Sequence, residues 1–306
     1  MIGIGATLAI HPGALGDVLL AIPALRALRV QRPGVTLALA AQPRLARLLA
    51  TLGEVDRALD FESLGLGALF TAGLGPARPL LVRAARVVCW FGSRDARFVA
   101  NLRGIVAGAV VASPAADDLP VWQHLRRTVG AALDGETAPL RVPPVAGEAG
   151  RQALLDAGWD GVRPVVVMHP GAGSAAKQWP VDGFAMVART VSREGPFALV
   201  VHEGPADAEA ASSLLAALGP QATRLREPPL EALAGVLASA VLYLGNDSGV
   251  SHLAAAVGAP SVVLFTQELL RWRPWSTKVG LPVVSTGGIV PTDLERVMAA
   301  ARAAMT

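Results

Sequence analysis

Short apolar runs alternate along the chain with stretches whose apolar residues recur at helical spacing. In the first half, the apolar runs predict strands at Thr7–His11, Val35–Ala40, Arg86–Phe91 and Ile105–Ala112. The second half repeats the arrangement, with predicted strands at Val165–Met168, Phe197–His202, Val241–Leu244 and Ser261–Phe265. Continuous apolar strands that alternate with helices are typical of parallel βαβ units, because such strands are covered on both faces. The pattern therefore predicts an α/β protein with mainly parallel sheets.

A repeated four-residue motif indicates that the chain consists of two similar halves. The sequence HPGA at residues 11–14 recurs at residues 169–172, and each copy ends the first predicted strand of its half. Residues 138–150 contain three prolines and little periodicity, so we expect this segment to be the linker. The sequence thus predicts two Rossmann-like domains, residues 1–150 and 151–290. Their sheets are expected to face a central cleft, since ligands bind at the carboxyl ends of strands in open α/β folds.

Composition indicates an ordered protein from a reducing compartment. Apolar residues make up 52% of the 306 residues and charged residues 17%, which excludes intrinsic disorder. Cys89 is the single cysteine, so a disulfide framework and a multi-cysteine metal site are excluded. The N-terminus lacks a basic segment, and the longest uncharged run, Ser248–Gln267, contains a Gly-Ala-Pro breaker. We therefore expect neither a signal peptide nor a membrane span, and predict a cytoplasmic protein.

Positive charge is concentrated in one part of the sequence. The net charge is +3, and residues 78–103 hold six arginines and one acid. One local patch in an otherwise balanced chain does not indicate nucleic acid; it suits an anionic ligand or an anionic membrane surface. A solvated face is the alternative, because surface arginines are common. The candidate binding residues of this patch are Arg83, Arg86, Arg94 and Arg97.

The segment 244–265 carries the strongest candidate chemistry. A strand is expected to end just before Asp247 and Ser248, which are good N-cap residues for the small-residue helix that follows. Gly249 lets a ligand approach the backbone, and the free N–H groups and dipole of the helix start suit a pyrophosphate. His252 is placed to donate to a phosphate. An ordinary capped helix with a structural histidine is the alternative.

A second glycine-rich turn occupies residues 169–180. It offers Gly171, the hydroxyl of Ser174 and the cation of Lys177 just before a predicted helix. It is not a Walker A loop, because Lys177 is neither preceded by Gly nor followed by Ser or Thr. A solvated lysine is the alternative, although the chain has only two lysines. Glu203 ends a further strand, where it is either a ribose ligand or a solvated loop acid.

In the first half, the turn with Gly13 and Gly16 places Asp17 at the start of the first helix. An acid there either stabilises the helix dipole or acts as a general base on an acceptor hydroxyl, and the sequence leaves both roles open. Five scattered histidines without a His-x-x-x-His pair argue against a bound metal. No Gly-x-Ser-x-Gly elbow supports a hydrolase triad.

Taken in order, these segments resemble glycosyltransferase family 9, the ADP-heptose:lipopolysaccharide heptosyltransferases. The resemblance rests on GD at residues 16–17, on KxWP at residues 177–180 after the second HPG, and on NDSG at residues 246–249 with His252. It implies a GT-B fold whose C-terminal domain holds the donor and whose N-terminal domain binds the acceptor. It also implies that the last helix, residues 291–306, packs back on the N-terminal domain.

The resemblance further implies an inverting, metal-independent transfer without a cofactor. A heptose would move from an ADP-heptose-like donor to an anionic, lipid-linked glycan of the lipopolysaccharide-core type, at the inner face of the cytoplasmic membrane. Asp17 is implied as the base, Glu203 as the ribose ligand, and Gly13 and Gly16 join the arginines as candidate acceptor-binding residues. The positions implied near the donor diphosphate are Lys177, Ser248, Gly249 and His252, and Asp247 matches the acid of the family's donor-binding loop. The alternatives are a nucleotide-sugar 2-epimerase, which needs no external acceptor, and a non-catalytic glycan-binding protein of the same fold.

Overall fold

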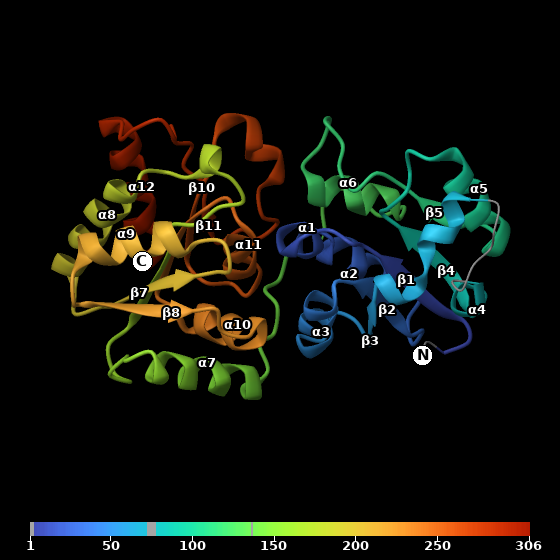
Figure 1. Ribbon diagram of the computed structural model, residues 1–306, viewed down its shortest axis with the longest axis horizontal. Helices are drawn as coiled ribbons and strands as arrows, with labels where there is room; N and C mark the ends of the chain where they lie inside the picture. Colours follow the sequence, from blue (N-terminus) through green and yellow to red (C-terminus); the bar gives the residue numbers. More distant parts are fainter. Residues whose placement is uncertain (1–2, 72–77, 136) are drawn as a thin grey trace. The chain divides into compact units, whose positions relative to one another are not determined.

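The structure, a computed structural model, describes residues 3–71, 78–135 and 137–306. The chain divides into two compact units, Met1–Thr137 (unit 1) and Ala138–Thr306 (unit 2), and each contains one parallel sheet with helices on it (Figure 1). The α/β class with two mainly parallel sheets is therefore confirmed.

Unit 1, within its described residues, is built on a five-stranded sheet in the order β3-β2-β1-β4-β5. The strands are β1 (Ala6–Ile10), β2 (Leu37–Ala41), β3 (Arg57–Asp60), β4 (Ala84–Cys89) and β5 (Val110–Val111). The helices are α1 (Leu15–Leu20), α2 (Ile22–Gln31), α3 (Pro43–Thr51), α4 (Arg78–Leu81), α5 (Ala96–Ile105) and α6 (Val121–Thr128), with 3-10 turns η1 (Glu62–Leu64) and η2 (Leu66–Phe70). Because β1 is central, the loop after it lies at the middle of the sheet's carboxyl edge.

Unit 2, all of whose residues are described, has a six-stranded sheet in the order β11-β10-β9-β6-β7-β8. The strands are β6 (Val165–His169), β7 (Ala198–Glu203), β8 (Ala222–Arg226), β9 (Leu242–Asn246), β10 (Ser261–Leu264) and β11 (Val279–Gly280). The helices are α7 (Pro144–Asp156), α8 (Val181–Glu194), α9 (Ala208–Leu218), α10 (Leu230–Ser239), α11 (Gly249–Ala256) and α12 (Pro291–Met305), with 3-10 turns η3 (Ala175–Lys177) and η4 (Gln267–Trp272). Strand β6 is central here, as β1 is in unit 1.

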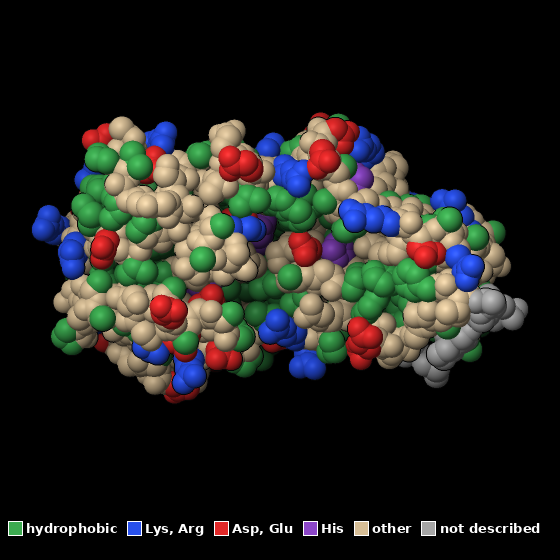
Figure 2. Space-filling view, turned by 45° about the horizontal axis from the view of Figure 1, so that its top comes forward, with side chains coloured by type: hydrophobic (Ala, Val, Ile, Leu, Met, Phe, Trp, Pro, Cys, Tyr) green, Lys and Arg blue, Asp and Glu red, His purple; other side chains and the backbone are tan. Residues whose placement is uncertain are grey.

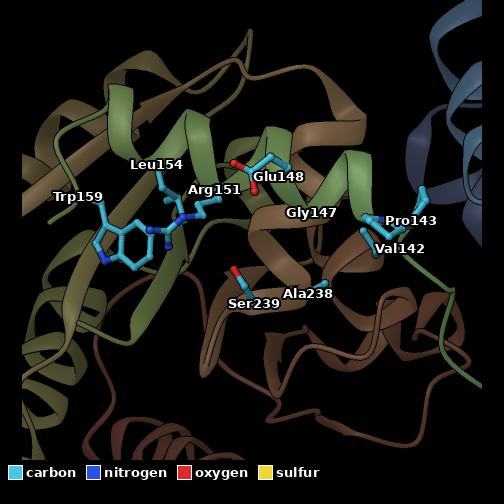
Figure 3. A pocket seen from close by; sticks show the side chains of 11 residues that line it. Val142, Pro143, Gly147, Glu148, Arg151, Leu154, Trp159, Ala238 and Ser239 are labelled. Carbon is cyan, nitrogen blue, oxygen red and sulfur yellow. The ribbon is translucent and has the colours of Figure 1, made fainter. Parts of the chain in front are cut away.

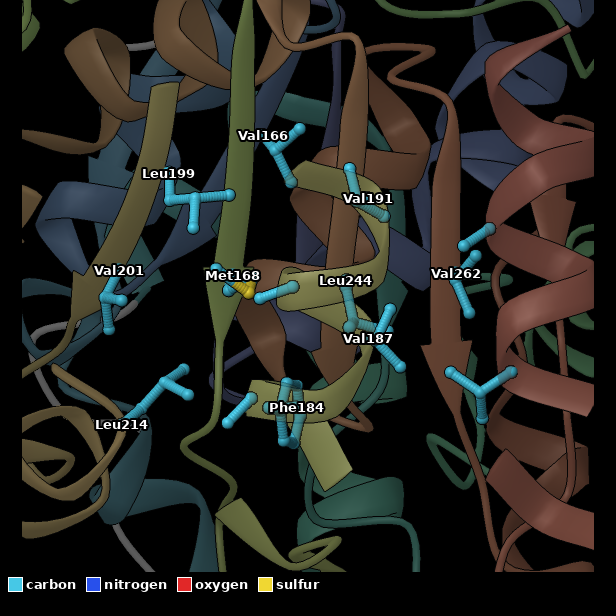
Figure 4. Packing of buried hydrophobic residues seen from close by; sticks show 14 of the residues in the cluster. Val166, Met168, Phe184, Val187, Val191, Leu199, Val201, Leu214, Leu244 and Val262 are labelled. Atoms are coloured by element: carbon cyan, nitrogen blue, oxygen red, sulfur yellow. The ribbon is translucent and has the colours of Figure 1, made fainter. Parts of the chain in front are cut away.

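The core of unit 2 shows why its strands are apolar throughout. Every residue of β6, β7, β9 and β10 is buried. Val166 of β6, Leu244 of β9 and Val262 of β10 face Phe184 and other apolar residues of α8 (Figure 4). Each such side chain contributes about 1.5–3 kcal/mol to folding when fully buried. The central strands therefore hold the loops at their carboxyl ends on a rigid base.

The linker expected at residues 138–150 is largely a helix. Helix α7 begins at Pro144, because proline is well suited to the first turn of a helix. It packs closely on α10: an added Cβ at Gly150 would lie 2.5 Å from the backbone nitrogen of Val236, and one at Gly235 would lie 2.1 Å from the carbonyl oxygen of Ala146. The glycines that suggested a loop instead allow two helices to touch. The division between the units falls at Thr137/Ala138, not at residue 150.

The last helix belongs to unit 2. Val297 and Ala301 of α12 are buried in the same core as β10 and α8. The carboxylate of Asp293 accepts a hydrogen bond from the backbone N–H of Ser285 at 2.8 Å and so fixes the start of the helix. The apolar stripe of α12 therefore covers the second sheet, and the expected packing of residues 291–306 on the N-terminal domain stays a prediction.

Two further observations concern the described residues as a whole. None of their helices combines the length and the apolar character that crossing a bilayer requires. Their His, Cys, Asp and Glu side chains form no group of three or more that is arranged to hold a metal ion.

Candidate functional site

The candidate donor residues of unit 2 follow two strands that are neighbours in the sheet. Strands β6 and β9 pair in parallel, and His169 at the end of β6 lies opposite Gly245 near the end of β9. The loop that ends at Lys177 and the loop that contains Asp247 therefore leave the same edge of the sheet. The topology brings together two motifs that lie about 70 residues apart in the sequence.

Asn246 ties these two loops together. Its side chain is fully buried and accepts a hydrogen bond from the backbone N–H of Trp179 at 3.0 Å. Its amide nitrogen donates to the carbonyl oxygen of Pro170 at 2.7 Å. A buried amide satisfied at both ends strongly favours one geometry, because leaving either group unpaired costs about 1–3 kcal/mol. Asn246 thus fixes both ends of the Lys177 loop.

Lys177 and Asp247 form an ion pair at this edge. The Nζ of Lys177 lies 2.8 Å from Oδ2 of Asp247, and Nε2 of His252 lies 3.6 Å from Oδ1. Burial of the Asp247 carboxyl opposes its ionisation, but the interactions with His252 and Lys177 outweigh that effect and lower its pKa. The side chain of Lys177 is 32% exposed, and an ammonium group has three N–H donors, of which Asp247 takes one. The lysine can therefore also reach an anion.

The start of α11 presents unpaired N–H groups beside this ion pair. The hydroxyl of Ser248 caps the helix by accepting from the backbone N–H of Ser251 at 3.2 Å. Among the described residues, the backbone N–H groups of Gly249 and Val250 donate to no protein acceptor. Helix start, lysine and histidine together make an anion-binding arrangement of the kind that holds phosphate groups.

Gly171 and Ser174 occupy different parts of the loop after β6. Gly171 is buried against Asp207, whereas Ser174 is exposed and its side chain caps no helix. The hydroxyl of Ser174 is therefore available to a ligand, and Gly171 has a packing role.

Glu203 is more firmly paired than the sequence suggested. It is buried at the end of β7, and its two carboxylate oxygens face guanidinium groups of β8: Oε2 lies 2.7 Å from Arg224 and Oε1 lies 3.1 Å from Arg226. Strand β8 runs beside β7, with Glu203 opposite Arg226. Any ribose contact by Glu203 therefore uses lone pairs that the two arginines leave available.

In unit 1, Asp17 lies in the first turn of α1, immediately after the loop that ends β1. Its Oδ2 accepts a hydrogen bond from the backbone N–H of Ala14 at 3.0 Å, which stabilises the helix start. The side chain is half-exposed, and Oδ1 accepts no hydrogen bond from the described residues. An added Cβ at Gly13 would lie 2.9 Å from Oδ2 of Asp17, so Gly13 makes room for this carboxylate. Asp17 thus combines a helix-capping role with one oxygen open to a ligand.

His11 lies beside Asp17 and is buried. Its Nδ1 accepts a hydrogen bond from the backbone N–H of Gly13 at 3.2 Å, and its ring packs against Trp90 with centroids 5.6 Å apart. Burial lowers the pKa of His11 to about 4, although Asp17 partly offsets this effect. His11 is therefore neutral at neutral pH and holds the turn that carries Asp17.

The low pKa of His11 predicts acid sensitivity. Its pKa falls from an ordinary 6.5 to about 4 in the folded protein, so the unfolded chain takes up this proton first. The effect of His11 on the free energy of unfolding is therefore fully favourable above about pH 6.5. As the pH falls toward 4, the free energy of unfolding decreases by up to about 1.4 kcal/mol per pH unit. We expect His11→Asn, which keeps an acceptor in the side chain, to flatten the acid limb of a plot of melting temperature against pH. Parallel curves for the variant and the wild type would contradict the assignment.

Comparison with known proteins decides the family. The sequence profile of glycosyltransferase family 9 (heptosyltransferase) matches residues 127–287 of the 306, more than half of the chain. The chain belongs to glycosyltransferase family 9. It is therefore a glycosyltransferase, and the predicted resemblance is confirmed.

Individual relatives agree with the family. Lipopolysaccharide heptosyltransferase 2 of Salmonella typhimurium is 28% identical over 289 residues, which cover 84% of this chain and 82% of the relative. The structure of E. coli ADP-heptose lps heptosyltransferase II matches with a TM-score of 0.76 at 22% identity and covers 98% of each chain. E. coli heptosyltransferase WaaC with ADP matches with a TM-score of 0.68 at 17% identity, covering 96% of this chain and 99% of that chain. The likeness to the solved structures confirms the GT-B fold for this family 9 glycosyltransferase.

The four candidate arginines of the first half lie before, within and after one strand. Arg83 directly precedes β4 and Arg86 is its third residue, whereas Arg94 and Arg97 follow its carboxyl end. Three residues of the strand, 87–89, follow Arg86, so its backbone lies roughly 10 Å before the end of the strand. The side chain of Arg78 lies outside the described part of the chain. The single patch expected from residues 78–103 is therefore divided.

The two pairs also differ in exposure. The guanidinium of Arg86 donates to the side chain of Gln31 at 2.7 Å and to the carbonyl oxygen of Val129 at 3.1 Å, and burial together with Arg32 lowers its pKa. Arg94 and Arg97 are exposed. On the face in view, Figure 2 shows basic and acidic side chains interspersed, with no broad basic field. Among the four candidates, only Arg94 and Arg97 keep exposed charge at the carboxyl edge of the sheet.

Unit 2 also contains a hollow apart from these loops. It has a volume of about 410 Å³ and lies between α7 and α10, lined in part by Pro143, Gly147 and Ser239. The guanidinium of Arg151 lies over the ring of Trp159, 5.4 Å from its centroid, at one end of the hollow (Figure 3). None of the candidate donor residues lines it.

Sequence reasoning missed the partners that hold the family 9 site residues in place. The bridge made by Asn246 was not expected, although a buried amide between a strand end and an N-cap is a usable signal. The pairing of Glu203 with Arg224 depends on β8, which the apolar pattern did not predict. The contact between Gly171 and Asp207 had no signal in the sequence, because the two residues meet only through the fold.

Proposed function

We propose that this family 9 glycosyltransferase moves a heptose from ADP-heptose to a lipopolysaccharide-core acceptor, with inversion at the anomeric carbon. The observation that carries the proposal is the arrangement of Lys177, Asp247 and His252 at the start of α11, which suits a diphosphate. The printed names of the relatives support it, since they are lipopolysaccharide heptosyltransferases and one solved relative is described with ADP.

The diphosphate of the donor is proposed to bind unit 2. Lys177 and the N–H groups of Gly249 and Val250 would neutralise the charge that grows on the departing ADP as the glycosidic bond breaks. Groups aimed at developing charge stabilise the transition state more than the ground state, which is the requirement for catalysis. Asp247 keeps Lys177 and His252 in position, and the exposed hydroxyl of Ser174 adds a donor. Glu203 is proposed as the ribose ligand.

Asp17 is proposed as the general base. Its free Oδ1 would take the proton of the acceptor hydroxyl while the oxygen attacks the anomeric carbon. The bond from that carbon to the phosphate oxygen breaks, and its electron pair leaves with ADP. One displacement from the face opposite the leaving group inverts the anomeric configuration.

The acceptor is proposed to be an anionic, lipid-linked glycan. Gly13 and Gly16 shape the turn before Asp17, and the exposed Arg94 and Arg97 follow the adjacent strand β4. These cations suit phosphate or carboxylate groups of the glycan, or an anionic membrane surface at the inner face of the cytoplasmic membrane. Arg86 is not part of this proposed surface, because its guanidinium donates to Gln31 and to the carbonyl oxygen of Val129.

A thermal-shift panel tests the choice of donor. A ligand at 100 times its dissociation constant stabilises the folded state by about 2.7 kcal/mol, so binding is readily seen. We expect ADP and ADP-heptose to raise the melting temperature by several degrees, and UDP, GDP and their sugar conjugates to have smaller effects. Equal shifts with all nucleotides would contradict an adenine-specific donor site.

A further inference from the structure

Three titratable side chains form a buried cluster that the proposed reaction does not use. His169 ends β6, His202 is next to the end of β7, and Asp207 precedes α9. The two histidines are buried and the side chain of Asp207 is only 12% exposed. The Nδ1 atoms of the histidines lie 3.1 Å apart, and Nε2 of His169 lies 3.7 Å from Oδ2 of Asp207. The cluster directly adjoins the loop that ends at Lys177.

Asp207 does not cap the helix that it precedes. It is the N-cap residue of α9, yet its side chain accepts no hydrogen bond from that helix. An aspartate at this position normally caps the helix, which is worth about 1 kcal/mol. The carboxylate has turned away from its own helix toward the end of β6.

Two glycines make room for this carboxylate. An added Cβ at Gly171 would lie 2.1 Å from Oδ1 of Asp207, and one at Gly204 would lie 2.5 Å from Oδ2. Neither glycine has a positive φ, so the backbone conformation does not require glycine at either position. Gly171 is needed at this place because Asp207 occupies the space of a side chain.

His169 is the polar neighbour of the carboxylate, and His202 in turn contacts His169. Burial lowers the pKa of both histidines, and Asp207 partly offsets this for His169. Two neutral imidazoles with their Nδ1 atoms in contact share one proton there. The Nδ1 of His169 also lies 3.3 Å from the backbone carbonyl oxygen of His202, and its Nε2 is the atom that faces Asp207. His202 thus holds the His169 ring from one side, and the carboxylate of Asp207 lies against the other side of the ring.

We propose that Asp207 is a positioning residue for the donor loop, residues 170–177, acting through its contact with Gly171 and its pairing with His169. The inference rests on the proposed function for the role of that loop. Holding the loop before the donor arrives avoids an ordering cost at the moment of binding.

Amide hydrogen exchange in the ligand-free protein tests the positioning directly. We expect Asp207→Gly to accelerate exchange of the amides of residues 171–177 about tenfold or more, because local opening governs exchange. Asp207→Asn, which keeps the shape and an acceptor oxygen, should stay near the wild-type rate. Asp182→Ala removes an exposed acid in the first turn of α8 and is the matched control. Unchanged loop exchange in Asp207→Gly would overturn the inference.

Calorimetric titration with ADP connects the loop to the donor. Asp207→Gly and Gly171→Ala should each weaken ADP binding about tenfold. That is the size of effect expected when the displaced donor loop loses one hydrogen bond to the charged diphosphate. Gly171→Ala acts by displacing the carboxylate, so the double variant should bind no more weakly than either single variant. Additive losses of about 100-fold would overturn the inference, since Gly171 would then serve the ligand independently. If the wild type failed to bind ADP, the donor assignment would fail, and the exchange rates would still decide whether Asp207 positions the loop.

Discussion

Replacing Asp17 with asparagine is expected to lower kcat by about 10²-fold or more, the usual scale for losing a general base. Asparagine retains an acceptor for the backbone N–H of Ala14, which Asp17 now holds at 3.0 Å, so the start of α1 should remain intact. The donor is proposed to bind unit 2, so the affinity for ADP should not change. Initial rates with saturating donor and acceptor, together with ADP titration, measure both quantities.

Asp95→Asn is the matched control for this change. Asp95 also caps a helix of unit 1, where its carboxylate accepts from the backbone N–H of Phe98 at 2.8 Å. Asp95 has no part in the proposed reaction. The kcat of Asp95→Asn should therefore remain within about twofold of the wild-type value, as expected for a change outside the reacting groups. If Asp17→Asn kept the wild-type turnover, the aspartate would serve only as a helix cap.

The second large effect is expected at Lys177. Lys177→Ala should lower kcat/KM for the donor by about 10²-fold or more, as for the loss of one preorganised donor to transition-state charge. It should also weaken ADP binding, because the ammonium holds the diphosphate in both states. The change leaves Asp247, whose side chain is 6% exposed, with His252 at 3.6 Å as its remaining ionic partner. Some loss of stability is therefore expected as well.

Lys278 offers the control, since the chain has only two lysines and Lys278 is exposed. Lys278→Ala removes the same charge from the same unit and should leave donor affinity unchanged. Melting temperatures of both variants separate folding from binding. Unaltered ADP affinity in folded Lys177→Ala would show that the phosphate site lies elsewhere.

The two central loops were predictable from the sequence because each follows a buried strand directly. The repeated HPGA motif ends β1 and β6, and both strands are central in their sheets. Continuous apolar runs fixed these strands, since both faces are covered. The parallel arrangement then placed the loops at the carboxyl edges, where the candidate residues are found.

Edge elements were less predictable, for a physical reason. β3 (Arg57–Asp60) and β8 (Ala222–Arg226) are edge strands with exposed polar residues, so their sequences lack the apolar run of a central strand. The predicted strand Ile105–Ala112 is the end of α5 followed by the two-residue β5. The sequence pattern did not predict helix α7, because the segment contains prolines and glycines. The glycine at position 150 is explained by the close packing of α7 against α10, which no local pattern reveals.

The sequence predicted the side chains that are candidates for ligand binding, but it did not predict the residues that hold them in position. Lys177 and Asp247 stand out because charged residues next to glycine and strand ends are conspicuous. The partners of Glu203 and Gly171, which are Arg224 and Asp207, come from neighbouring elements that no local pattern connects. The division of the arginine patch likewise depends on where β4 begins and ends.

The most direct test of the account is a reaction that contains ADP-heptose and a delipidated lipopolysaccharide-core acceptor. We expect ADP to be released only when both are present, and the acceptor to gain one heptosyl residue whose anomeric configuration is opposite to that of the donor. Formation of an epimer from the donor alone, or tight donor binding without any transfer, would contradict the proposed function.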